Sequence, residues 1–232
     1  MQGTPAVCHT AGARSFALSP AATVNHSALL DHLARALQRP LPGPDAQARM
    51  APQPRGGWPA GADAGGLRHA AGLLLLFPID DRPHLVLTVR SATVRHAGQV
   101  SLPGGVIEPG ESVEDAALRE AREEVGCETD ALRLLGRLTP LDIAVSGFRL
   151  HPVLAASDLR PVLTPSDHEV ARILEIPVDT LLSPSIRTRR PMPRGALTMD
   201  VPVFETGGVA IWGATAMVLA EFLTLVGWPE PS

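Results

Sequence analysis

The apolar residues of this chain recur with different spacings on either side of a Pro/Gly-rich stretch. Over residues 27–38 they fall three and four positions apart, which predicts an amphipathic helix. Its apolar face is Leu29, Leu30, Leu33 and Leu37. After residue 66 the apolar residues form short continuous runs with the length of buried strands. These predicted strands are 70–77, 85–89, 132–138, 148–155, 169–176 and 199–204.

Short polar or Pro-containing segments separate the predicted strands. Residues 80–83 have the composition of a turn, so the first two strands are expected to form a hairpin. A short helix is predicted at 178–182 after Pro177, and a closing helix at 211–226. Strands interleaved with a few helices predict an α/β fold. The remaining segments are expected to be loops: 90–98, 102–105, 140–147, which could cross a site, and the basic, Pro-broken 187–194.

The chain length suits one domain with an appendage, since 232 residues are few for two full domains. Residues 1–26 are small and polar without any period, so we expect a disordered tail. Residues 27–66 are expected to hold the amphipathic helix and then a linker rich in Pro, Gly and Ala over 40–66. The main domain is predicted at 67–228.

An acidic helix is predicted between Ser112, a good N-cap residue, and Gly126, a good stop residue. Helical spacing places Glu120, Glu123 and Glu124 within an arc of about 100°. Like charges three and four residues apart repel each other and weaken an isolated helix. Their clustering becomes favourable when a hard divalent cation sits among them, because Mg²⁺ prefers oxygen ligands.

A Gly/Pro-rich loop leads into this helix. Gly104 and Gly105 allow backbone shapes and close approach to a ligand that other residues resist. Arg119 can reach Glu123 one turn on, or Glu111 in the loop, and bidentate bonds would fix the carboxylates. The alternative interpretation is a solvated acidic helix with a turn in front of it.

The complete spacing decides between these interpretations. It runs Gly105, five residues, Glu111, seven residues, Arg119-Glu120, two residues, Glu123-Glu124, one residue and Gly126. This pattern resembles the Nudix box, with Ala121 in place of a larger aliphatic residue. Nudix hydrolases cleave a nucleoside diphosphate linked to another moiety. The resemblance implies the Nudix fold, a mixed β-sheet sandwiched between α-helices, and a Mg²⁺ or Mn²⁺ cofactor held by Glu120, Glu123 and Glu124.

The residues before the box are similar to the signature of the coenzyme A diphosphatase branch. Arg90-Ser91, Arg95, Gly98 and the run 102–105 follow one another as in that branch. This chain departs from the signature in two places. The gap between Arg95 and Gly98 is one residue shorter than in the branch, and Leu102 stands where the branch has phenylalanine. Segments 142–152, 169–170 and 211–216 extend the resemblance over about 68–226.

The resemblance implies a small-molecule nucleotide substrate of the coenzyme A type, giving 3′,5′-ADP and 4′-phosphopantetheine. Arg90, Arg95, Gly104 and Gly105 would bind this substrate, because arginine's planar fork suits phosphate oxygens. Metal-assisted attack of water would involve Glu120, Glu123 and Arg119. The general base would be a glutamate of the box or Glu169 outside it.

Composition limits the other partners. A formal net charge of −4 argues against a nucleic-acid binder, which needs a basic stripe. The apolar run 207–228 is long enough to span a membrane, but Glu221 and the glycines of the run favour a buried C-terminal helix entered by a strand, so no membrane partner is expected. Two cysteines, Cys8 and Cys127, imply no disulfide framework; with no secretory signal visible, a cytoplasmic location is expected. The sequence leaves a homodimer open.

The sequence leaves two alternatives to a coenzyme A diphosphatase. The first is a Nudix hydrolase for another nucleotide, such as ADP-ribose, a dinucleoside polyphosphate or a damaged nucleoside triphosphate, which the shortened Arg95–Gly98 gap keeps open. The second is a ligand-sensing regulator without catalysis. Such a regulator should have lost glutamates of the box, and this chain keeps all of them.

Overall fold

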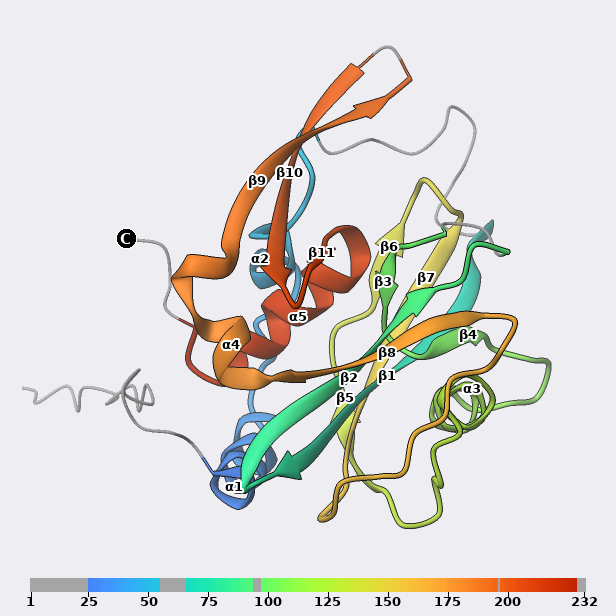
Figure 1. The fold of residues 1–232 in the computed structure, drawn as a ribbon, viewed down its shortest axis with the longest axis vertical. Helices are drawn as coiled ribbons and strands as arrows, with labels where there is room; N and C mark the ends of the chain where they lie inside the picture. Colours follow the sequence, from blue (N-terminus) through green and yellow to red (C-terminus); the bar gives the residue numbers. More distant parts are fainter. Residues whose placement is uncertain (1–24, 55–65, 94–96, 196, 229–232) are drawn as a thin grey trace, which may run out of the picture.

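The computed structural model describes residues 25–54, 66–93, 97–195 and 197–228. In this part a central sheet of eight strands has the order β3-β2-β1-β7-β5, with β4 added to β1, β6 to β7 and β8 to β2 (Figure 1). Its strands are β1 (Arg68–Ile79), β2 (Arg82–Arg90), β3 (Val100–Ser101), β4 (Gly104–Val106), β5 (Arg133–Arg137), β6 (Leu141–Ile143), β7 (Phe148–Ala156) and β8 (Val170–Pro177).

The sheet is mixed, as predicted. β1 and β7 pair in parallel from Arg68↔Phe148 to Leu76↔Ala156, whereas the other pairs are antiparallel. The predicted hairpin of β1 and β2 is confirmed, and Asp80 and Asp81 make its turn with φ of +49° and +62°. A strand covered on both faces needs a continuous apolar run, which explains the leucines of β1.

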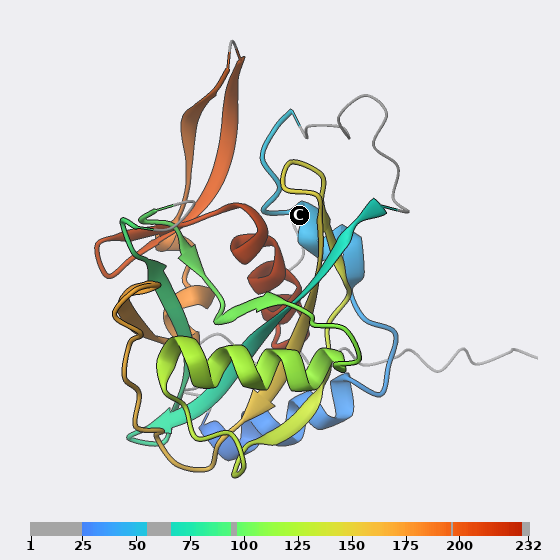
Figure 2. The same cartoon turned by 90° about the vertical axis from the view of Figure 1, so that its right-hand side faces the viewer.

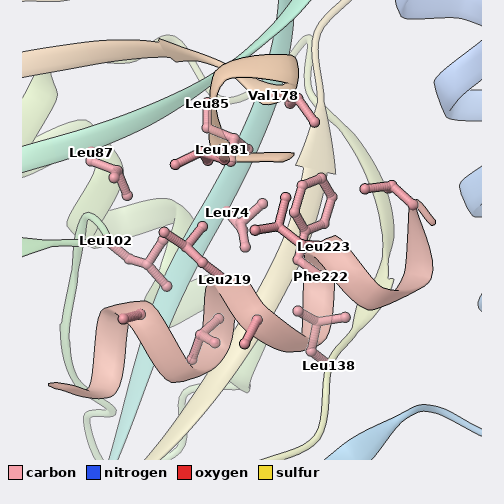
Figure 3. Close-up of a cluster of buried hydrophobic side chains, with 14 of the residues drawn as sticks. Leu74, Leu85, Leu87, Leu102, Leu138, Val178, Leu181, Leu219, Phe222 and Leu223 are labelled. Atoms are coloured by element: carbon pink, nitrogen blue, oxygen red, sulfur yellow. The ribbon is translucent and has the colours of Figure 1, made fainter. Parts of the chain in front are cut away.

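Helices cover both faces of the sheet. One face carries α3 (Val113–Val125), whose Ala116, Ala117 and Ala121 are fully buried against Leu73 and Leu75. The other face carries the larger core, with α5 (Gly213–Leu225), α1 (His26–Ala36) and α4 (Val178–Leu182) around Leu74 (Figure 3). The predicted α/β fold, a mixed sheet between helices, is therefore confirmed.

A second, three-stranded sheet replaces a predicted loop. Segment 187–194 is β9 (Arg187–Arg194), which pairs with β10 (Leu197–Thr206); β11 (Val209–Ile211) lies on the other side of β10, and η2 (Pro184–Ile186) precedes β9. The loop prediction for 187–194 was wrong because β9 is an edge strand, and an edge tolerates Pro191 and Pro193. The β9–β10 hairpin projects from the body of the molecule (Figure 2).

Two other predicted loops contain short strands. Within 140–147, β6 pairs with β7 from Leu141↔Leu150 to Ile143↔Phe148. Within 102–105, Gly104 and Gly105 begin β4 and pair with β1. Neither strand shows in the sequence pattern, because two or three residues are too few to display a period.

The stretch expected to be a linker also differs over its first half, where α2 (Gly43–Ala48) packs against α5. The contact centres on Glu221, which is fully buried on α5. Its carboxylate accepts hydrogen bonds from Gly43 N at 3.2 Å, Gln47 Nε2 at 2.9 Å and Thr139 N at 3.1 Å. Three donors satisfy a buried carboxylate and tie α2 to the core. The domain bounds themselves remain a prediction.

The apolar run 207–228 forms β11, the turn before it and α5 rather than one long helix. No helix in the described ranges is long and apolar enough to cross a membrane. Cys127 is a buried free thiol, and Cys8 lies outside the described residues.

Candidate active site

α3 begins and ends where its sequence predicts. Ser112 Oγ accepts a hydrogen bond from Asp115 N at 3.1 Å, which caps the first turn. Gly126 ends the helix with a φ of +62°, a left-handed conformation that favours glycine. Because three of the buried apolar residues of α3 are alanines, the helix lies close to the sheet, and Glu124 and Glu120 reach Gly104 and Gly105 of β4.

The two glycines of β4 make room for this approach. A Cβ on Gly104 would lie closer than 3.0 Å to Ala71 O of β1. A Cβ on Gly105 would lie closer than 3.0 Å to both carboxylate oxygens of Glu120. A side chain at position 104 would push the backbones of β1 and β4 apart, and one at 105 would displace the Glu120 carboxylate.

The predicted acidic residues occupy three different environments. Glu124 is buried, with 3% of its surface exposed, and accepts a hydrogen bond from Gly104 N at 3.2 Å. Burial raises the pKa of Glu124 to about 7, against the Gly104 hydrogen bond and the charge of Arg90, which lower it. Burial also raises the pKa of the half-buried Glu120. Glu123 is more exposed, with 58% of its side chain open to solvent.

Arg119 holds the remaining carboxylates in place. Its Nε and Nη2 donate to the two oxygens of Glu111 at 2.9 and 3.1 Å, and Nη2 also donates to Val106 O at 3.0 Å. Its Nη1 donates to Glu120 Oε1 at 2.9 Å and to Glu123 Oε2 at 3.0 Å. The bonds to Arg119 lower the pKa of Glu111, and the bonds to Glu111 and Glu120 raise that of Arg119. The arginine thus orients glutamates from the loop and from the helix.

Arg90 lies beside the cluster at the end of β2. Its main-chain N–H donates to Gln99 O and its carbonyl oxygen accepts from Gly98 N, both at 2.9 Å. Two main-chain hydrogen bonds therefore join Arg90 to residues 98–99. Arg90 pairs with Val170 of β8, and its charge lowers the pKa of Glu124. Arg95 lies outside the described residues, and its predicted role stays a prediction.

Glu169 comes from the residue before β8. Its negative charge adds to the burial that raises the pKa of Glu120 and of Glu124. The structure therefore brings Glu169 and Arg90 to the glutamates and glycines of the box. Within the described ranges, no group of three or more His, Cys, Asp or Glu side chains is arranged as a ready metal site. Glu123 accepts a hydrogen bond from Arg119, and Glu124 accepts one from Gly104 N.

Sequence reasoning missed some of the pairings near this face. His151 Nε2 lies 2.9 Å from His69 Nδ1, in a hydrogen bond between the neighbouring strands β7 and β1. The pairing of β1 with β7 brings the two histidines together, and no short-range pattern indicates it.

Comparisons with known proteins agree with this geometry. A family model described as the NUDIX domain matches residues 66–192. An uncharacterised Nudix hydrolase, NudL, from Photorhabdus laumondii is 38% identical over 66% of this chain and 82% of its own length. The NudL of Yersinia enterocolitica is 37% identical over 65% of this chain and 78% of its own length.

A solved structure extends the comparison to the fold. The M. smegmatis Nudix hydrolase RenU matches with a TM-score of 0.53 and 19% identity, over 76% of this chain and 98% of RenU. At that identity the likeness concerns the fold alone. The family model and the two NudL relatives show that the chain belongs to the Nudix family and is a hydrolase of phosphorus-containing anhydrides.

Proposed function

We propose that this enzyme hydrolyses the diphosphate of coenzyme A or one of its derivatives, giving 3′,5′-ADP and 4′-phosphopantetheine or its acyl form. The observation that carries the proposal is the position of Arg90. This first arginine of the coenzyme A signature pairs, at the end of β2, with Val170, one residue after Glu169, and its charge lowers the pKa of Glu124. A guanidinium beside the metal-binding glutamates suits a substrate that carries several phosphates.

The carboxylates fit a divalent cation. Glu120, Glu123 and Glu124 offer oxygen ligands of the kind that Mg²⁺ and Mn²⁺ prefer. Burial and neighbouring negative charges raise the pKa of Glu124, so a bound cation would stabilise its ionised form. When bound, Mg²⁺ or Mn²⁺ would neutralise the diphosphate and lower the pKa of the attacking water.

The other residues of the proposed site have separate roles. Arg119, held by Glu111, orients Glu120 and Glu123 toward the site. Gly104 and Gly105 let the substrate and Glu120 approach the backbone of β4. Glu169 takes a proton from the attacking water while the water oxygen bonds to phosphorus and the bridging P–O bond breaks. A general base of this kind raises the reaction rate about 10²–10⁴-fold.

The test is a product assay on coenzyme A, acyl-coenzyme A esters, ADP-ribose and nucleoside triphosphates, each with Mg²⁺ and with Mn²⁺. We expect coenzyme A or its esters to have the highest kcat/KM and to release 3′,5′-ADP. An enzyme that ignores coenzyme A and cleaves ADP-ribose would discard the substrate proposal. The alternative, a hydrolase of another nucleoside diphosphate derivative, draws its support from the shortened Arg95–Gly98 gap.

A further inference from the structure

A hydroxyl pair joins the end of β2 to the segment that carries Glu169. Ser91 Oγ lies 2.7 Å from His168 O, Thr93 Oγ1 lies 2.8 Å from the same oxygen, and the two hydroxyl oxygens are 2.6 Å apart. The carbonyl oxygen has two lone pairs, so it accepts from both hydroxyls, or it accepts from one hydroxyl while the other donates to its neighbour. Either arrangement uses both hydroxyls together.

The main chain reinforces this contact. Ser91 N donates to Glu169 O at 2.9 Å. The β2–β8 register shifts between Val89 and Arg90, and such a bulge redirects the side chains that follow it. The hydroxyl pair therefore lies where both strands leave the regular sheet, directly after Arg90 and directly before β8.

From this geometry we infer that Ser91 and Thr93 are positioning residues for Glu169. They hold the main chain of His168 and Glu169 so that the Glu169 carboxylate faces Glu120 and Glu124. Ser91 is 8% exposed and its hydroxyl is bound within the protein, so it acts as an anchor and not as a reader of substrate. The inference rests on the proposed role of Glu169 as general base.

A double-mutant cycle tests this inference on the full-length enzyme loaded with Mg²⁺. Ser91→Ala and Thr93→Val are each made alone and together with Glu169→Gln. We expect each single variant to lower kcat about tenfold with KM within about twofold, because a displaced base loses its alignment with the water. In the Glu169→Gln background the same substitutions should lower kcat by less than about twofold, since residues that act as a unit are not additive.

Two further variants separate positioning from general damage. Thr93→Ser keeps the hydroxyl and should retain kcat. Thr224→Val is a matched control, because it removes another hydroxyl–carbonyl bond, of 2.8 Å to Ala220 O, on the opposite face of the sheet. Its kcat should stay at the wild-type value. Thermal unfolding of each variant shows whether it is folded. If Ser91→Ala misfolds, the Thr93 variants still carry the test, because Thr93 is exposed and its substitution leaves the core unchanged.

Three outcomes would overturn the inference. Equal losses in both backgrounds would mean that the hydroxyls act without Glu169. A rise in KM at constant kcat would make Ser91 a substrate contact. A Glu169→Gln variant with normal kcat would remove the base from the proposed function as well. Equal losses together with a low but measurable kcat of Glu169→Gln would overturn the positioning role and leave the proposed function standing. If the enzyme proves specific for ADP-ribose, the same cycle is measured on ADP-ribose.

Discussion

The two helices on opposite faces of the sheet each bury one glutamate, and the two differ in their surroundings. Glu221 of α5 accepts hydrogen bonds from Gly43 N, Gln47 Nε2 and Thr139 N. Glu124 of α3 accepts one from Gly104 N, and the other charges near it include the carboxylates of Glu120 and Glu169. A buried carboxylate surrounded by donors stabilises a fold, whereas one that faces other carboxylates is suited to a cation.

The two faces differ in their apolar side chains for a related reason. The α5 face is filled by large residues such as Phe222 and Leu219, which make the main core. The α3 face uses Ala116, Ala117 and Ala121, and the β4 glycine Gly105 lies against Glu120 of the same helix. Small side chains bury less apolar surface than large ones. They also let the α3 backbone approach the sheet closely enough for Glu120 and Glu124 to contact β4. The α5 face therefore contributes mainly stability, and the chemistry that we propose lies on the α3 face.

The largest expected effect is on turnover when Glu124 is changed. Glu124→Gln keeps the shape and the oxygen that accepts from Gly104 N, and loses a ligand charge. We expect kcat to fall at least about 10²-fold, the scale for losing the anchor of a catalytic metal ion. The measurement is steady-state kinetics at saturating Mg²⁺, with thermal unfolding to confirm the fold. Near-normal turnover would remove Glu124 from the metal site.

The next effect concerns substrate choice. If Arg90 contacts the 3′-phosphate, Arg90→Ala should lower kcat/KM for coenzyme A far more than for dephospho-coenzyme A, which lacks that phosphate. A charge-assisted contact implies a loss of about ten- to a hundredfold. Arg189→Ala is the matched control, because Arg189 lies on the projecting hairpin, paired with Asp200 at 2.6 Å. Equal losses on the two substrates would make Arg90 a general diphosphate contact.

Local signals explain what the sequence predicts well. The caps at Ser112 and Gly126 and the apolar runs of β1 and β7 are readable within a few residues, and the structure has these elements. The sequence did not predict α2, because α2 is held by Glu221, a residue far along the chain. The Glu221 carboxylate accepts hydrogen bonds from Gly43 N of α2 and from Thr139 N. β9 was missed since its prolines are tolerated only at an edge, which depends on the sheet order.

The candidate site divides in the same way. The Nudix spacing identifies Glu111, Arg119 and the glutamates of α3 from sequence alone. It does not show that Glu124 is buried or that Gly105 faces Glu120, because both follow from the pairing of β4 with β1. Nor does it show the contact of Ser91 with His168, whose partners are 77 positions apart.

The third prediction uses pH in the absence of metal. The pKa of Glu124 is raised from 4.5 to about 7, so in that window the folded protein holds a proton that the unfolded chain has lost. The free energy of unfolding should therefore fall as pH rises from 5 to 8, by about 3 kcal/mol more in wild type than in Glu124→Gln. Urea unfolding with EDTA measures this difference, and Mg²⁺ at pH 8 should restore stability to wild type alone. Parallel pH profiles for the two proteins would contradict the burial of an ionisable Glu124.

The smallest expected effect returns to α5 and completes the comparison. Glu221→Gln replaces one acceptor oxygen by an NH₂ group that faces N–H donors from Gly43, Gln47 or Thr139. One buried donor then lacks a partner, which should cost about 1–3 kcal/mol of unfolding free energy. Because the α5 face is separated from the site by the sheet, kcat of the folded variant should stay within about twofold of wild type. Urea unfolding and steady-state kinetics on the same preparation measure both quantities. A Glu221→Gln enzyme that is stable but slow would show that the α5 face also shapes the chemistry, and the division between the two faces would then be wrong.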